Sequence, residues 1–318
     1  MLGNSRRLSR ALWASCGVAV LLGLAGCGPT PQVTVTLKPA DLSATEPAAT
    51  AGQPAAASGA EVATTAPAAG FGNLAGTVLF DGAPPELSPA VTAGQDVRDK
   101  DVCSAKAIPD ESLQVDAETK GVRNVFIYLE KPPAGVDAGP VPDTRIEFDQ
   151  IGCRFTPHVL AVRTKQTVFI LNSDPVAHNT HTFPNRNVAF NGVVKVNEKE
   201  GVPLVYARSE QVPLEVKCDF HPWMRGYHLP LEHSFVGLTD EKGKFEIKGL
   251  PSGTHSFRVW QEKGGLLERA YKVTIKADAT EEVKISFGAA KFARFEGPRP
   301  APVIINPSPL VARAASRQ

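Results

Sequence analysis

The sequence predicts an all-β protein, built either from two packed sheets or from two small sandwiches in series. Short runs of β-branched and aromatic residues, each closed by Gly or Pro, recur between residues 71 and 288. Gly and Pro are plentiful, with 27 of each in 318 residues, and this suits a chain with many turns. No segment keeps helical periodicity over three turns, which argues against a helical bundle.

The expected strands follow one another along the chain, starting with "GTVLFDG". In the first two thirds of the chain they occupy residues 76–82, 122–130, 158–164, 166–173, 203–209 and 212–218. In the last third they occupy residues 227–233, 234–247, 255–262, 269–277 and 281–287. Turn residues separate them at the spacing typical of sandwiches and barrels.

The first 27 residues have the composition of an export signal. A basic stretch, "MLGNSRRLSR", precedes an apolar stretch that ends in "LAGC" at Cys27. This pattern resembles a bacterial lipoprotein signal, with an ordinary cleaved signal or an N-terminal membrane helix as the alternative. The resemblance implies that Cys27 carries lipid. It also implies an extracytoplasmic protein, in the periplasm or on the cell surface, that is anchored to a membrane.

Two further segments have the composition of disordered sequence. Residues 28–70 are rich in Ala, Pro, Thr and Gly, and predict a disordered linker. Residues 289–318 are Pro-rich and mildly basic, and predict a disordered tail. The formal net charge of the whole chain is +1, so charge gives no reason to expect a nucleic-acid partner.

Two short stretches combine residues that bind soft metal ions. "KCDFHPWM", residues 217–224, contains Cys218, His221 and Met224, and "NSDPVAHNTHTF", residues 172–183, contains His178 and His181. Two imidazoles and one thiolate can form a trigonal plane with a weak axial thioether, which is typical of blue copper. Zinc favours more thiolates or a third strong ligand and rarely uses methionine.

These two stretches resemble a cupredoxin of the plastocyanin and amicyanin type. The match lies in "AHN" followed by "CDFHPWM", whose Cys-x2-His-x2-Met spacing is that of the short ligand loop, and it covers residues 140–235. The resemblance implies a Greek-key β-sandwich and one type 1 copper ion bound by His178, Cys218, His221 and Met224. His181 is then expected near the ligands without binding the metal.

The resemblance also implies roles for residues around the ligands. The backbone N–H of Asn179 would point at the thiolate sulfur, whereas Pro222 has no N–H to offer it. Trp223 and Pro175 would form an apolar rim at which the exposed edge of His221 meets a redox partner. Fewer hydrogen bonds to the sulfur would favour Cu(I) and raise the reduction potential.

The remaining cysteines are expected to pair in the oxidising compartment outside the cytoplasm. With Cys218 assigned to the metal, Cys103 and Cys153 are free to form a disulfide. A second metal site that combines these two cysteines with His158 is the alternative. His228 and His233 follow the ligand loop and are expected to be partly exposed residues of a strand.

The sequence after the ligand loop resembles a carboxypeptidase-regulatory-like, or prealbumin-like, β-sandwich. The resemblance rests on a T-D-x-x-G-x-F motif at residues 239–245 and an L-P-x-G motif at residues 250–253. "LAGTVLFDGAPPE", near residue 75, resembles the opening strand of the same module. Residues 71–139 and 236–288 are therefore assigned to this module. Whether the copper region is inserted in it or woven into its sheet stays open.

We therefore expect a membrane-tethered copper protein that carries single electrons and is not an enzyme. Its partner would be a redox protein such as a cytochrome or a dehydrogenase. The alternative is a copper-binding, copper-delivery or structural surface lipoprotein without a redox role. A multicopper oxidase or a nitrite reductase would need His-x-His pairs and a covalent haem would need C-x-x-C-H, and the sequence contains neither motif.

Overall fold

The structure is a computed structural model that describes residues 70–293. The expected export signal at 1–27 with Cys27, the linker up to residue 69 and residues 294–318 lie outside the described residues. Among the described residues, no helix has the length and apolar character needed to cross a membrane.

Strands account for nearly all of the regular secondary structure of the described chain. In order, its elements are β1 (Phe71–Asp81), α1 (Lys100–Cys103), β2 (Phe126–Leu129), β3 (Ile146–Gln150), β4 (Phe155–Thr156), β5 (Val159–Arg163), β6 (Thr167–Asn172), β7 (His178–Phe183), β8 (Asn191–Val194) and β9 (Glu198–Val205). They continue with β10 (Leu214–Lys217), β11 (Arg225–Leu231), β12 (Val236–Leu238), β13 (Lys244–Pro251), β14 (Gly253–Gln261), β15 (Gly265–Ile275), β16 (Thr280–Gly288) and α2 (Ala289–Phe292).

The first sandwich is formed by strands from both ends of the described chain. One of its sheets has the order β13-β1-β16 and the other has the order β12-β2-β14-β15. Strand β1 pairs antiparallel with β13 and parallel with β16, so the N-terminal strand is held on both edges by C-terminal strands. Apolar side chains of both sheets fill the space between them, including Leu74, Ile127, Ile247, Phe257 and Ile285.

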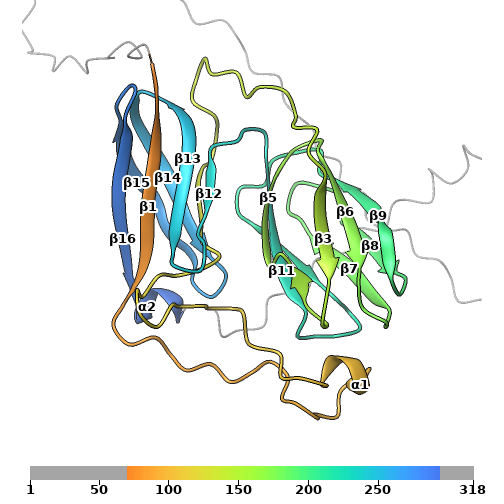
Figure 1. The fold of residues 1–318 in the computed structure, drawn as a ribbon. Helices are drawn as coiled ribbons and strands as arrows, with labels where there is room; N and C mark the ends of the chain where they lie inside the picture. Colours follow the sequence, from red (N-terminus) through yellow and green to blue (C-terminus); the bar gives the residue numbers. More distant parts are fainter. Residues whose placement is uncertain (1–69, 294–318) are drawn as a thin grey trace, which may run out of the picture. The chain divides into compact units, whose positions relative to one another are not determined.

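The second sandwich contains strands β3 to β11 and therefore interrupts the first one between β2 and β12 (Figure 1). Its sheets have the orders β5-β11-β10-β7-β8 and β4-β3-β6-β9. Its core includes Phe148, Val168, Ile170, Leu214 and Val216. The region that carries the predicted ligands is thus an insertion in the strands that flank it.

Strand β2 packs in two directions. Successive side chains of a strand point to opposite faces, so Ile127 and Leu129 enter the core of the first sandwich. Phe126 and Tyr128 lie on the other face, in a cluster with Tyr227 of β11. All four residues of β2 are buried, as expected for a strand covered on both faces.

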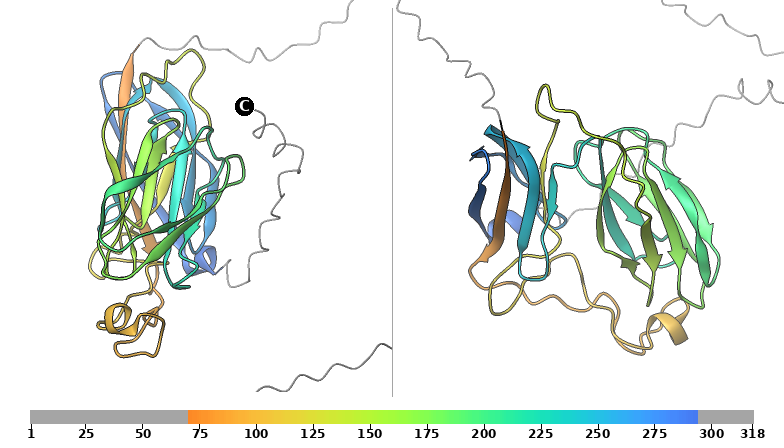
Figure 2. Two further views of the ribbon diagram at one scale, coloured as in Figure 1. Left: turned by 90° about the vertical axis from the view of Figure 1, so that its right-hand side faces the viewer. Right: turned by 45° about the horizontal axis from the view of Figure 1, so that its top comes forward.

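The segment between β1 and β2 runs from the first sandwich to the end of the second, where α1 lies (Figures 1 and 2). A disulfide between Cys103 of α1 and Cys153 fixes the segment there. The pairing of these two cysteines agrees with the sequence prediction.

The all-β prediction is confirmed, but its details are incomplete. Strands β3, β4, β7 and β8 and helix α1 were not expected from the sequence. The chain also continues into α2 within the segment where a tail was expected, because Phe292 is buried and stacks on Phe80 with ring centroids 5.2 Å apart.

The expectation that His228 and His233 are partly exposed is wrong. Their exposed fractions are 0% and 1%. His228 contacts the Tyr206 hydroxyl through Nδ1 at 2.8 Å, and its ring lies edge-on against Phe148. Burial lowers the pKa of His228 to about 3, and burial with the nearby charge of Arg163 lowers the pKa of His233 to about 4.

We expect the free energy of unfolding to decrease as the pH falls from about 6.5 to about 4. In this window the unfolded chain protonates His228 while the folded chain keeps it neutral, so acid favours unfolding. In His228→Gln the fall should be shallower by up to about 1.4 kcal/mol per pH unit. Urea unfolding at a series of pH values measures the difference, and parallel pH profiles for the two proteins would contradict it.

Candidate metal centre

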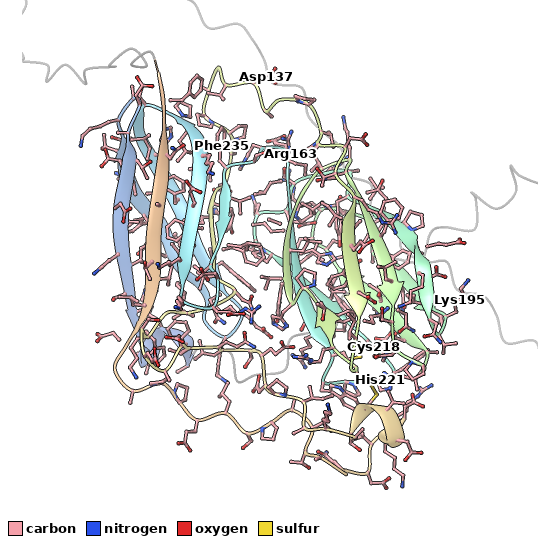
Figure 3. All side chains as sticks on the ribbon, viewed as in Figure 1. Asp137, Arg163, Lys195, Cys218, His221 and Phe235 are labelled. Atoms are coloured by element: carbon pink, nitrogen blue, oxygen red, sulfur yellow. A yellow bond between two sulfur atoms is a disulfide. The ribbon has the colours of Figure 1, made fainter. Side chains whose placement is uncertain are left out.

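Strand pairing brings the two predicted ligand stretches to the same end of the second sandwich. Strands β7 and β10 are antiparallel, with His181 opposite Lys217. The beginning of β7 therefore lies beside the chain that leaves the end of β10, and these positions are occupied by His178 and Cys218. Figure 3 shows Cys218 and His221 at this end of the sandwich, close to α1.

The ligand loop between β10 and β11 is held by its own backbone. The N–H of Cys218 donates to the carbonyl of Met224 at 3.2 Å, and the N–H of Met224 donates to the carbonyl of His221 at 2.9 Å. Met224 is 1% exposed and belongs to the same apolar cluster as Cys218. The loop thus turns its cysteine, histidine and methionine into the interior.

Three of the four predicted ligands form a compact buried group. One potential ligand atom from each of His178, Cys218 and His221 lies within 4.8 Å of the other two. The Nδ1 atoms of the two histidines are 2.9 Å apart, and Nδ1 of His221 is 3.6 Å from the Cys218 sulfur. The exposed fractions of the three residues are 0%, 2% and 0%.

A carboxylate contacts the opposite nitrogen of each histidine. Nε2 of His178 is 2.9 Å from Oδ2 of Asp174, and Nε2 of His221 is 3.0 Å from Oδ2 of Asp99. A carboxylate at this distance accepts the ring proton, which places N–H at Nε2 and leaves Nδ1 as the electron-pair donor. Metal-binding histidines are commonly oriented by carboxylates in this way.

This arrangement fits a bound cation. With their protons at Nε2, both imidazoles direct the lone pair of Nδ1 toward the same small space, which the Cys218 sulfur also faces. Three electron-pair donors at these distances repel one another unless a proton or a metal ion lies among them. Two imidazoles and one thiolate are a donor set suited to copper or zinc.

The surroundings also favour the thiolate form of Cys218. Burial alone would raise the pKa of the Cys218 thiol. In the metal-free site a proton on Nδ1 of His178 or His221 is donated to the sulfur, and these hydrogen bonds, with one from the backbone N–H of Asn179, lower the pKa to about 6. Burial acts against the charge of His178 as well. There the hydrogen bond to Asp174 and the contact with the sulfur prevail and raise the pKa of His178. A metal ligand must be deprotonated, so a thiol with a low pKa is ready to bind.

Asn179 joins the two predicted ligand stretches through its side chain. Its side-chain oxygen accepts the backbone N–H of Asp219 at 2.6 Å, and its amide donates to the Asp219 carboxylate at 2.8 Å. The ring of His181 points to the same carboxylate, with Nδ1 3.1 Å from Oδ2. His181 is therefore not in the buried group, and it contacts the residue that follows Cys218.

The predicted exposure of His221 is wrong, because Asp99 and the chain around it cover the ring. Pro175 and Pro222 are exposed and Trp223 is half-buried, but no edge of His221 reaches solvent between them. The indole N–H of Trp223 donates to the carbonyl of Cys153 at 3.1 Å, and its ring centroid is 5.1 Å from that of His221.

The alternative metal site of Cys103, Cys153 and His158 is not formed, because its two cysteines are bonded to each other. His158 instead contacts Glu262 through Nε2 at 2.6 Å. Burial alone would lower the pKa of His158, but the hydrogen bond and the charge of Glu262 raise it. This contact links the second sandwich to the turn between β14 and β15.

Sequence reasoning missed the two carboxylates that hold the histidines. Asp174 lies four residues before His178, so its place in the ligand stretch was an available signal. Asp99 lies 122 residues before His221, and only the predicted pairing of Cys103 with Cys153 could have brought its segment near the site.

No family model matches the chain, and no curated protein matches it. The chain is similar to a proline-to-glycine mutant of amicyanin in the reduced Cu(I) form, with 23% identity and a TM-score of 0.25 over 34% of this chain and 99% of the other. A purple cupredoxin from Nitrosopumilus maritimus matches 27% of this chain and 99% of its own length, with 18% identity and a TM-score of 0.23. Similarities of this size assign neither a family nor a function.

We expect Asp174→Ala to destabilise the metal-free protein. The carboxylate is 5% exposed and accepts the backbone N–H groups of Gly152 and Cys153 at 2.6 and 2.7 Å, which the substitution leaves without an acceptor. The free energy of unfolding should fall by about 2–4 kcal/mol, as measured by urea unfolding. The exposed Asp101→Ala should change it by less than about 0.5 kcal/mol. Equal effects of the two substitutions would show that the buried carboxylate is dispensable.

Proposed function

We propose that the second sandwich binds one type 1 copper ion and carries single electrons. The observation that supports this most strongly is the buried group of two imidazole Nδ1 atoms and one cysteine sulfur, with both outer imidazole nitrogens bound to carboxylates. When bound, copper supplies a centre that accepts and releases one electron. His178, Cys218 and His221 would hold it, with Met224 as a weak fourth ligand.

Copper is favoured over zinc by the composition of the site. Structural zinc sites use four strong ligands, commonly with two or more thiolates. Here the described residues offer one free thiol, that of Cys218, because Cys103 and Cys153 are paired. The buried methionine on the same loop is a suitable axial donor for copper and a poor one for zinc.

Electron transfer is favoured over catalysis or copper delivery by burial. The three ligand residues are at most 2% exposed, which leaves no open position for a substrate. The same burial opposes handing the metal to another protein, because a donor site must let its ligands be exchanged. Hydrogen bonds at the outer nitrogens hold both rings in place, so the ligands need to move little when the charge of the metal changes.

The cellular setting is proposed from the sequence. A lipid on Cys27 would anchor the protein to a membrane outside the cytoplasm, and residues 28–70 would act as a tether. The electron would pass to and from a redox protein such as a cytochrome or a dehydrogenase. The first sandwich would then serve as the support in which the copper region is inserted.

We expect the chain without its first 27 residues to bind Cu(II) with an intense thiolate-to-copper absorption band in the visible range. Cys218→Ser should remove the band, because serine supplies no thiolate. Optical and EPR titration with Cu(II) measures both proteins, and His181→Gln serves as the matched control that should keep the band. Colourless binding that Cys218→Ser leaves unchanged would end the electron-carrier proposal.

A further inference from the structure

The outer side of His221 is covered by the segment around Asp99, which lies 122 residues earlier in the chain. The ring is 0% exposed, and its Nε2 atom is 3.0 Å from Oδ2 of Asp99. The side chain of Asp99 is itself one-third exposed. Asp99 therefore stands between the buried ring and the solvent.

The backbone around Asp99 is built to present this carboxylate. Asp99 has φ 54° and ψ 39°, a left-handed conformation that aspartate tolerates better than most residues. Its carbonyl accepts the N–H groups of Val102 and Cys103 at 3.0 and 2.8 Å. The guanidinium of Arg98 lies 4.4 Å from the centre of the Phe220 ring, next to His221 in the ligand loop. The segment thus contacts the loop through Arg98 as well as through Asp99.

One disulfide connects the supports of both histidines. Cys103, whose N–H binds the carbonyl of Asp99, is bonded to Cys153. The N–H of Cys153 donates to Oδ2 of Asp174 at 2.7 Å, and this same oxygen contacts His178. Asp99 and Asp174, which orient the two rings, are therefore each hydrogen-bonded to the backbone of one cysteine of the same disulfide.

We propose that Asp99 is a positioning residue of the metal centre. It holds His221 with Nδ1 turned toward Cys218, and with its segment it closes the centre against solvent. This inference rests on the proposed metal site. It goes beyond that site because it assigns a role to a remote segment that contributes no ligand.

Two variants separate the parts of this role. Asp99→Gly removes the carboxylate and keeps a backbone that favours positive φ. Asp99→Asn removes the charge but keeps a side-chain oxygen that can accept the Nε2–H of His221. Asp101→Asn is the matched control, because Asp101 is an exposed carboxylate two residues away.

The first readout is copper affinity, measured by competition with a chelator. Loss of an outer hydrogen bond to a metal-binding histidine typically weakens metal binding by about 10- to 100-fold. We expect a loss of this size in Asp99→Gly, a smaller loss in Asp99→Asn and none in Asp101→Asn. The second readout needs no metal. Diethyl pyrocarbonate should modify His221 of the metal-free protein about tenfold faster in Asp99→Gly, as followed by mass spectrometry.

Unchanged affinity and an unreactive His221 in Asp99→Gly would overturn the proposal. If the unsubstituted protein gave no thiolate-to-copper band, the proposed function would fail instead. The reactivity of His221 in the metal-free protein would still decide whether Asp99 covers and holds the ring, so the two failures are distinguishable.

Discussion

The architecture around the site follows from one electrostatic constraint: a thiol and two imidazoles are buried together with their electron pairs converging. Donors buried this closely need a cation among them and partners for their remaining N–H groups. Asp174 and Asp99 provide those partners, at 2.9 Å from His178 and 3.0 Å from His221. Because Asp99 comes from the segment after β1, the site also requires that segment to cross from the first sandwich to the second. The disulfide between Cys103 and Cys153 secures it there.

The second sandwich is inserted in the first one directly after β2, so the segment between β1 and β2 can reach the metal centre and return. Strand β1 lies between β13 and β16, so the first sandwich closes only when both ends of the described chain are present. Strand β2 then packs its two faces on different cores, with Phe126 and Tyr128 toward β11 and Ile127 and Leu129 toward β1. The second sandwich is held between these strands and β12, and β11 connects its ligand loop directly to the contact between the sandwiches.

The sequence predicted what depends on local patterns and failed where partners are remote. The β class, the proximity of His178, Cys218 and His221 and the disulfide could be inferred from strand patterns, residue spacing and cysteine arithmetic. Strand β7 was missed because "HNTHTF" is too polar to be recognised as a strand, although it pairs with β10 and four of its six residues are buried. The cover over His221 was not predicted, because no local pattern links it to a residue 122 positions away and the only long-range signal was the predicted pairing of Cys103 with Cys153. His228 was misjudged for a similar reason, since its partner Tyr206 belongs to a separate part of the second sandwich.

The central claim is that His178, Cys218 and His221 bind one copper ion together. X-ray absorption at the copper edge, on the protein loaded with one equivalent of copper, tests it most directly. Our account predicts one sulfur and two imidazole nitrogens as the strongly bound neighbours, in both the oxidised and the reduced protein. A copper ion surrounded only by nitrogen and oxygen, or one that exchanges its neighbours on reduction, would contradict it.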